Sequence, residues 1–185
     1  MAKKVLVPIA DGTEEIEAVS IIDTLRRAGA EVTVASVTEK LNIVASRGVR
    51  IDADAMIGEC VDTTYDLVVL PGGMPGATHL RDSKELTEIL KQQQQQGRLY
   101  GAICASPAVV LEHHGLIGGR KATCYPSFAK DLSNADASGS RTVVDGTLIT
   151  GQGPGTAIEF ALKLVELLFG SEKAAEIAKA MIVRI

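Results

Sequence analysis

The hydrophobic residues of this chain follow two alternating patterns, short continuous runs and runs with helical spacing. Lys3–Ala10 is a Val- and Ile-rich run that ends at Asp11-Gly12, which predicts a buried strand and a turn. From Thr13 the apolar positions recur at helical spacing, with acidic residues at the start and arginines at the end, which predicts a helix. Glu31–Val37 is a second strand-like run. Strand, helix and strand in this order predict a parallel βαβ unit with a right-handed crossover.

The alternation of strands and helices continues through the rest of the chain. In Leu41–Asp54 apolar and polar residues alternate less regularly, which suggests a short hairpin or edge strands. The further predicted strands are Tyr65–Gly73, Arg98–Cys104 and the two halves of a hairpin over Thr142–Thr150, and the further predicted helices are Ser83–Gln95, Ser106–His114, Thr156–Phe169 and Glu172–Ala180. No linker or repeat interrupts this order, so residues 1–185 are expected to form a single α/β domain. Its sheet should be mostly parallel and covered by helices on both faces, as a three-layer sandwich.

Composition fits a buried aliphatic core and narrows the class of partner. Hydrophobic residues make up 46% of the chain, but aromatic residues only 3%, so the core must consist of Val, Ile, Leu and Ala. A formal net charge of −4 and scattered Lys and Arg argue against a nucleic-acid-binding surface, which would need a basic stripe. No apolar run approaches the roughly 20 residues that span a bilayer, so no membrane association is expected.

The amino-terminal residues bear on location. Lys3 and Lys4 lead directly into the strand pattern without a cleavage site, so no signal peptide is expected and a cytoplasmic protein is predicted. An organelle stays open, because removal of a transit peptide would leave no trace.

Three cysteines, Cys60, Cys104 and Cys124, are an odd number without C-x-x-C spacing. This pattern is typical of neither a disulfide framework nor a zinc site, and it favours reduced thiols and no bound metal. Cys60, in a polar loop, is expected to be incidental. Cys124 ends a short strand near a proline and could lie close to the site of Cys104.

Cys104 stands between a predicted strand and a predicted helix. Small residues flank it on both sides, as a sharp strand-to-helix turn requires: Gly101, Ala102, Ala105 and Ser106. Such a nucleophile elbow presents its central side chain to neighbouring backbone N–H groups. The positive end of the following helix dipole should lower the pKa of the thiol and make it nucleophilic and oxidisable. The alternative is an inert cysteine of the core.

Three turns of unusual composition follow strands at what should be the same edge of the sheet. They are Asp11–Glu17, Leu70–Ala77 and Ile103–Ala108. Ligands of open α/β sheets bind outside this edge. Gly72 and Gly73 would let backbone N–H groups approach a small group closely. The glycine-rich stretch Gly151–Ala157 lacks the third Rossmann glycine and the Walker lysine, so no nucleotide cofactor is expected.

The histidines are poorly placed to assist the thiol. His113 and His114 close the helix that follows Cys104, about 15 Å along its axis, where they are better suited to interact with the helix end. His79 falls in the loop after the Pro-Gly-Gly turn. A Cys–His pair is therefore not expected.

A carboxylate is the alternative helper. Glu17 lies on a mostly apolar side of the first helix. It is either a solvated helix residue or a half-buried acid with a raised pKa beside the thiol, able to share a proton with it. Glu14 and Glu15 are expected to be ordinary acids of the first helical turn.

Four segments, in this order and spacing, resemble the ThiJ/PfpI superfamily, within the branch of the Parkinsonism-associated protein deglycase and its bacterial and plant relatives. They are DGTEEIEAV, VVLPGGMPGA, GAICASPAVVL and GQGPGTAIEFAL, and the similarity extends over nearly the whole chain. The resemblance implies a flavodoxin-like α/β sandwich with a cysteine nucleophile elbow. It also implies that Cys104 is the nucleophile and that Glu17 hydrogen-bonds it. The backbone N–H groups of Gly73 and Ala105 would then lie beside the sulfur.

The resemblance further implies a homodimer. The partner subunit would bring an arginine that matches Arg47 toward the site, with Asp23 as the ion-pairing residue of that arginine. The apolar residues Ile16, Val19 and Ile22 would then lie in the interface as well as beside the site. No cofactor and no metal ion belongs to the implied site.

The chain departs from the family pattern in one respect, the absence of a histidine at either of two positions. Animal members carry a histidine directly before the proline that matches Pro126, where this chain has Tyr125. Other branches place a histidine directly after the cysteine, where this chain has Ala105. A Cys-His-acid protease or a fast histidine-assisted hydrolase is therefore not expected. The Tyr125 hydroxyl could hydrogen-bond a substrate, but its pKa near ~10 makes it a poor base.

Two functions remain open from the sequence. A cofactor-independent glyoxalase or deglycase would act on methylglyoxal, glyoxal or their adducts, with Cys104 as nucleophile and Glu17 as proton shuttle. Its activity is expected to be weak without the family histidine. The alternative is an oxidative-stress sensor or redox-regulated chaperone, in which the same cysteine is oxidised to a sulfinate. Beyond the four implied residues, the expected site lining is Tyr125, Gly72 and Arg47 of the partner subunit.

Overall fold

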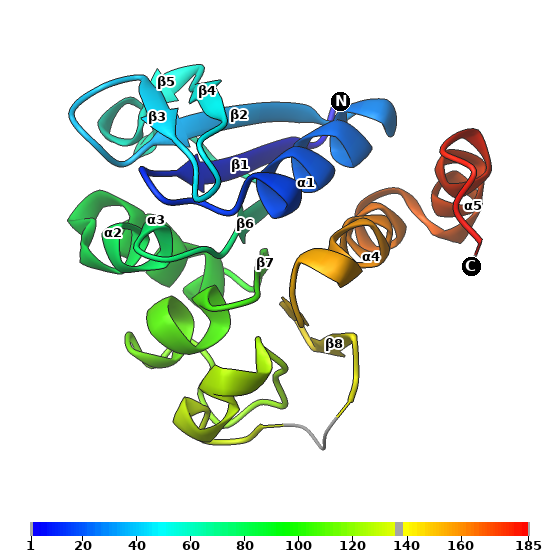
Figure 1. Ribbon diagram of the computed structural model, residues 1–185. Coiled ribbons are helices and arrows are strands. Elements are labelled where there is room, and N and C mark those ends of the chain that lie inside the picture. Colours follow the sequence, from blue (N-terminus) through cyan, green and yellow to red (C-terminus); the bar gives the residue numbers. More distant parts are fainter. Residues whose placement is uncertain (1, 136–138, 185) are drawn as a thin grey trace.

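The computed structural model describes residues 2–135 and 139–184 and is built around a seven-stranded sheet in the order β5-β2-β1-β6-β7-β9-β8 (Figure 1). Its strands are β1 (Lys4–Ile9), β2 (Glu31–Ser36), β5 (Ala55–Met56), β6 (Leu67–Leu70), β7 (Leu99–Ile103), β8 (Thr142–Asp145) and β9 (Leu148–Gly151). Neighbouring strands are parallel except β8 and β9, which form the predicted hairpin. A separate antiparallel pair, β3 (Asn42–Val44) and β4 (Arg50–Asp52), confirms the hairpin expected in that region.

Helices cover both faces of the sheet, which confirms the predicted three-layer α/β architecture (Figure 1). One face carries α1 (Glu15–Arg27), α4 (Ala157–Phe169) and α5 (Ser171–Ala180). The other carries α2 (Gly76–Asp82), α3 (Lys84–Gln95) and the π-helix η2 (Pro107–Glu112). Three short 3₁₀ segments complete the described elements: η1 (Ile57–Cys60), η3 (Pro126–Asp131) and η4 (Pro154–Thr156).

Alternation along the central strands separates two aliphatic cores. On β1, Val5, Val7 and Ile9 belong to the core under α1 and α4, whereas Leu6 belongs to the core under α2 and α3. All four side chains are fully buried. Burial of each aliphatic side chain of this size contributes about 1.5–3 kcal/mol, so the central strands form a rigid base for the turns at their ends.

Two local predictions from the sequence are wrong, and a third differs only in the type of helix. The helix α2 occupies residues assigned to a loop, so His79 is helical; its short length and glycine-containing start hide the helical period. Cys60 lies in η1 and is buried, with its thiol directed at the Met56 carbonyl oxygen (3.6 Å), because the neighbouring polar residues turn outward. The segment after Cys104 is helical as expected, but it forms a π-type turn rather than an α-helix.

Within the described ranges, no helix is both long and apolar enough to cross a membrane.

Candidate active site

The turns that follow β1, β6 and β7 meet at the carboxyl edge of the sheet, where the sequence places its candidate residues (Figure 1). The Glu14 N–H donates to the Gly72 carbonyl oxygen (2.9 Å), which joins the first turn to the second. The Cys104 N–H donates to the Gly151 carbonyl oxygen (3.0 Å), which joins the third turn to β9. These backbone bonds hold the first turn against the second and the third turn against β9.

Cys104 has the strained backbone of a nucleophile elbow. Its φ is +66°, in the left-handed region that non-glycine residues rarely occupy. Its N–H is bonded to Gly151, and its carbonyl oxygen accepts a hydrogen bond from the Tyr125 N–H (2.8 Å). Strain of this kind persists only where the surroundings hold the residue, and it is common at active sites. The predicted elbow is therefore present.

Glu17 projects from α1 into this turn and is completely buried. Its Oε2 accepts a hydrogen bond from the Gly72 N–H (2.7 Å). Its Oε1 is also buried and accepts no hydrogen bond from any described residue. Burial raises the pKa of this carboxyl group from 4.5 to about 7, against the opposing effects of Gly72 and Cys104. Of the two interpretations of Glu17, the structure supports the buried acid.

The Cys104 thiol has a raised pKa, which is opposite to the prediction from the helix dipole. The residue is 9% exposed, and burial is the main cause, followed by the negative charge of Glu17. The N–H groups of Gly73 and Ala105 lie at the sulfur and act in the opposite direction. The dipole argument fails because the thiol is withdrawn from water and faces a carboxylate.

Close packing leaves no room for a Cβ atom at either glycine of the Pro-Gly-Gly turn. A Cβ atom on Gly72 would lie 2.6 Å from the Cys104 Cβ and 2.9 Å from the Glu17 Oε2. Gly73 has a φ of +91°, and a Cβ there would lie 2.4 Å from the Gly12 carbonyl oxygen. Only glycine therefore allows the backbone N–H groups to approach the thiol and the carboxyl group so closely.

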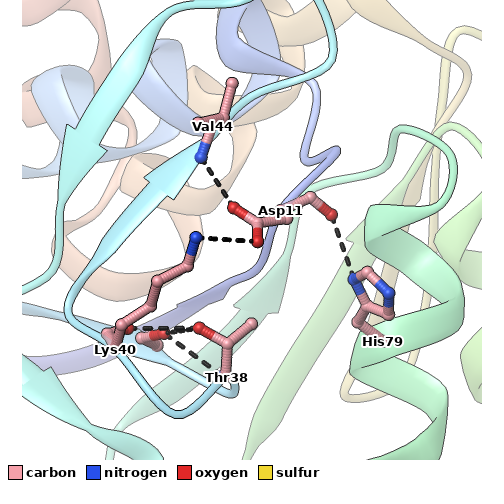
Figure 2. A network of polar contacts seen from close by, with 6 residues as sticks. Asp11, Thr38, Lys40, Val44 and His79 are labelled. Carbon is pink, nitrogen blue, oxygen red and sulfur yellow. Dashed lines mark hydrogen bonds and ion pairs between the residues drawn. The ribbon is translucent and has the colours of Figure 1, made fainter.

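A polar network holds the turn after β1 (Figure 2). The Asp11 carboxylate accepts a hydrogen bond from the Val44 N–H (2.8 Å) and pairs with the Lys40 Nζ (3.1 Å). The Val44 N–H is the main cause that lowers the pKa of Asp11. The Asp11 carbonyl oxygen lies 3.1 Å from the His79 Nδ1, which must carry the proton of that ring because a carbonyl can only accept. The network ties the turn to β3 and to α2.

Glu14 and Glu15 are not ordinary solvated acids. Both are buried, at 8% and 7% exposure, and an oxygen of each lies 2.8 Å from the Ser46 hydroxyl. Glu15 also accepts a hydrogen bond from the Arg47 N–H (2.8 Å). Hydrogen bonds from Ser46 and from backbone N–H groups lower the pKa of Glu15 despite the opposing effect of its burial. These two acids thus anchor the β3–β4 turn, a role that their sequence positions do not reveal.

Other predicted residues lie at the margin of the site. Tyr125 is 45% exposed, and its ring lies against Gly153, 3.2 Å from where a Cβ would stand. Arg47 is exposed and directs its guanidinium at the Ser46 carbonyl oxygen (3.2 Å), so its role toward a partner stays a prediction. Cys124 is buried next to Tyr125, and burial and Asp131 raise its pKa to about 11, which makes it a poor nucleophile.

The hydrogen bonds of the histidines to other described residues do not involve Cys104. The His114 Nε2 lies 2.8 Å from the Arg81 carbonyl oxygen and so links the segment that follows η2 to α2. Across residues 2–135 and 139–184, no three His, Cys, Asp or Glu side chains converge as a metal ion would require.

One contact at the site has no local sequence signal. The buried Ser106 hydroxyl donates a hydrogen bond to the Pro71 carbonyl oxygen (2.6 Å), 35 residues away, instead of capping the helix that it precedes. The sequence identifies Ser106 only as a small residue of the elbow, since nothing local links it to the Pro-Gly-Gly turn.

Comparisons with known proteins identify the family of this chain. The model of the DJ-1/PfpI family matches residues 3–167. DJ-1 homolog B of Arabidopsis thaliana is 49% identical over 180 residues, which are 97% of this chain but only 41% of the plant protein, so the chain spans less than half of that relative. A Caenorhabditis elegans protein named glutathione-independent glyoxalase DJR-1.2 is 37% identical over 180 residues, covering 96% of this chain and 94% of that protein.

A solved structure shows the same fold. Oxidized Toxoplasma gondii DJ-1 superimposes with a TM-score of 0.97 at 52% sequence identity, and the match covers 100% of both chains. The family model, the relatives and the structural match agree: this chain belongs to the DJ-1/PfpI family.

Proposed function

We propose that this protein is a cofactor-independent glyoxalase or deglycase that converts methylglyoxal, glyoxal or their adducts through Cys104 and Glu17. The observation that carries the proposal is the meeting of a strained cysteine, a buried carboxyl group with a pKa of about 7, and two backbone N–H groups at one point. The C. elegans relative named for glutathione-independent glyoxalase activity supports the same reaction class.

Glu17 activates the thiol in this mechanism. Transfer of the thiol proton to the Glu17 carboxylate gives a thiolate and a neutral acid, and the net charge of the buried pair does not change. A base with a pKa of about 7 is well matched to work near neutral pH. The Glu17 Oε1, which has no hydrogen bond from the described residues, is free to receive this proton.

The thiolate then adds to the aldehyde. A C–S bond forms, and the electron pair of the C=O bond moves to the oxygen, where the N–H groups of Gly73 and Ala105 stabilise the negative charge. The oxyanion takes the proton from Glu17, which gives a hemithioacetal on Cys104 and a carboxylate ready to act again.

A proton transfer and a hydrolysis complete the reaction. Glu17 removes the proton from C1 of the hemithioacetal, and the resulting enediol receives a proton at C2, which leaves a thioester on Cys104. Water attacks the thioester carbon, the C–S bond breaks, and the thiol is regenerated. One methylglyoxal and one water thus give one lactate, with no external oxidant or reductant. In the deglycase version the aldehyde carbon comes from an early adduct of a protein or nucleotide.

An exposed apolar face supports a homodimer. Ile16 and Val19 on α1 and Ile158 on α4 are 55%, 49% and 40% exposed. Ile16 and Ile158 also line a cavity of about 630 Å³ at this face. Asp23 is paired with Arg27 in the protomer (2.6 Å), so pairing of Asp23 with Arg47 of the partner subunit would require the exchange of an existing ion pair. Light scattering of the wild type and of Val19→Glu tests this, since a monomeric wild type contradicts the dimer.

Oxidation of Cys104 to a sulfinate by two molecules of hydrogen peroxide, each of which is reduced to water, is the second candidate function. The N–H groups of Gly73 and Ala105 that stabilise an oxyanion would equally stabilise a sulfinate oxygen, and a protonated Glu17 could donate to it. The structural match to a protein described as oxidized favours this alternative specifically.

Lactate formation from methylglyoxal without glutathione tests the enzyme. Wild type should turn over, whereas Cys104→Ser and Glu17→Gln should lose at least about 100-fold, because each removes a reacting group. Tyr65→Phe is a suitable control and should stay active. Tyr65 is buried in the core under α2 and α3, away from the site. A wild type no faster than buffer contradicts the proposal, and mass spectrometry of Cys104 after peroxide treatment would then test the sensor.

A further inference from the structure

One peptide unit connects Ser106 to Glu17. The Ser106 hydroxyl donates to the Pro71 carbonyl oxygen (2.6 Å), and the Gly72 N–H donates to the Glu17 Oε2 (2.7 Å). This carbonyl and this N–H belong to the same Pro71–Gly72 peptide group. Peptide groups are planar and normally trans, so their C=O and N–H point in opposite directions. A hydrogen bond that holds the carbonyl therefore also aims the N–H.

The Ser106 hydroxyl is committed to this contact. Ser106 is 0% exposed, and its side chain does not cap the helix that begins at Pro107. Both hydrogen bonds of the peptide group are buried, where an unpaired polar group costs the most and where linked hydrogen bonds polarise each other. Electron withdrawal at the carbonyl makes the N–H a stronger donor.

The same hydroxyl also ties two turns of the site together. Ser106 follows the elbow of Cys104 by two residues, and Pro71 directly precedes Gly72 and Gly73. A Cβ on Gly72 would lie 2.6 Å from the Cys104 Cβ, so little free space separates the turns. Ser106 thus acts at the junction between the nucleophile and the groups that surround it.

We infer that Ser106 is a positioning residue, whose hydroxyl orients and polarises the Pro71–Gly72 peptide so that its N–H holds the Glu17 carboxylate against the Cys104 thiol. The inference rests on the proposed function, in which Glu17 exchanges a proton with the thiol. Ser106 itself touches neither the thiol proton nor the aldehyde. The Gly72 hydrogen bond favours the carboxylate form of Glu17, so its weakening should make Glu17 retain its proton to a higher pH.

The pH dependence of Cys104 alkylation tests this without any aldehyde turnover. Iodoacetamide modification is followed by mass spectrometry of the peptide that contains Cys104, from pH 5 to pH 10, in wild type and in Ser106→Ala. Besides Cys104, the titratable or charged group that acts on Glu17 is Glu14, and neither is altered by this substitution. The first inflection of the rate should move upward by about half a pH unit, the size expected from loss of roughly 10–30% of a charge-assisted hydrogen bond.

Two further variants separate positioning from general destabilisation. Ser106→Thr keeps a hydroxyl and should restore the wild-type inflection. Ser36→Ala removes another fully buried serine hydroxyl, bonded to Thr38 (2.8 Å), and should leave the inflection unchanged. An inflection in Ser106→Ala that coincides with that of the wild type overturns the inference. An altered inflection in a protein without lactate formation would instead contradict the proposed enzyme and leave the positioning role intact.

If Ser106→Ala does not fold, NMR spectroscopy of the wild-type protein tests the positioning role of Ser106. In NMR spectra, the Gly72 amide proton and the buried Ser106 hydroxyl proton should shift with a common midpoint near pH 7, because both report on the same polarised peptide group. A Ser106 hydroxyl resonance that does not respond while the Gly72 amide titrates would refute the inference.

Discussion

Replacement of Glu17 by Gln should make the protein more stable at alkaline pH, although it removes the proposed base. Glu17 is fully buried, and its pKa rises from 4.5 to about 7 in the folded state. Between these two values the folded protein binds a proton at Glu17 that the unfolded chain has released, so the contribution of Glu17 to stability is fully present below about pH 4.5 and is lost as pH rises through about 7. A difference of about 2.5 units corresponds to about 3 kcal/mol at full ionisation.

Gln is a suitable probe because it removes the titration but keeps a side-chain oxygen for the Gly72 N–H. The free energy of unfolding is measured in urea at one protein concentration, from pH 5 to pH 8, for wild type and Glu17→Gln. Groups with lowered pKa values, such as Asp11 and Glu15, add the same pH dependence to both proteins and cancel in the difference. The difference should change by about 2–3 kcal/mol in favour of Glu17→Gln as pH rises over this range.

The control is Glu172→Gln, which removes one carboxylate from the exposed start of α5. Because this carboxylate is exposed to water, its removal should change the free energy of unfolding by no more than about 0.5 kcal/mol. A pH-independent difference between wild type and Glu17→Gln would refute the reasoning, because the carboxyl group would then not be penalised by burial. The proposed mechanism would at the same time lose a base that is poised near neutral pH.

Three further predictions concern residues around the pair. Gly72→Ala should lower lactate formation at least about 100-fold and destabilise the protein by about 1–3 kcal/mol, because its Cβ would lie 2.6 Å from the Cys104 Cβ. Normal turnover and normal thermal unfolding of this variant would contradict the packing argument. Asp11→Ala should lower the free energy of unfolding in urea by about 1 kcal/mol, whereas Asp11→Asn, which keeps an acceptor for the Val44 N–H, should lower it less. An equal decrease in both variants would show that the effect comes from the exposed ion pair with Lys40 and not from the hydrogen bond. Tyr125→His should raise turnover at pH 7 by roughly tenfold if an imidazole there can exchange protons with the substrate, and unchanged kinetics would show that position 125 takes no part.

The strand and helix periods predict the layers of this fold because they record which side of each element is buried. On β1, for example, alternate residues face opposite cores, and the continuous apolar run from Val5 to Ile9 is what a strand buried on both faces requires. The helix α2 escapes prediction because Gly76–Asp82 is too short to show a period and follows directly on a glycine-rich turn. Its stability comes from packing of Ala77 and Leu80 against the second core.

Some features of the candidate site could be predicted from neighbouring residues in the sequence, whereas others depend on contacts between segments far apart in the chain. Cys104, Gly72 and Gly73 could be found from sequence because a strained turn and close backbone approach demand particular residue types at neighbouring positions. The direction of the thiol pKa could not, since it depends on burial and on Glu17, 87 residues earlier in the chain. The bond from Ser106 to Pro71 likewise joins two segments whose proximity only the fold creates.

The two raised pKa values explain why the elbow alone would not make a reactive cysteine. Burial and the facing carboxylate oppose ionisation of Cys104, so a thiolate forms near neutral pH only if Glu17 accepts the proton at the same time. The buried pair then holds a single negative charge, and the N–H groups of Gly73 and Ala105 stabilise whichever atom carries it beside them. In the two proposed functions that atom is the sulfur before reaction, the aldehyde oxygen during addition, or a sulfinate oxygen after oxidation. If both proposals hold, catalysis and oxidation would compete for one set of donors, and both would require the proton on Glu17.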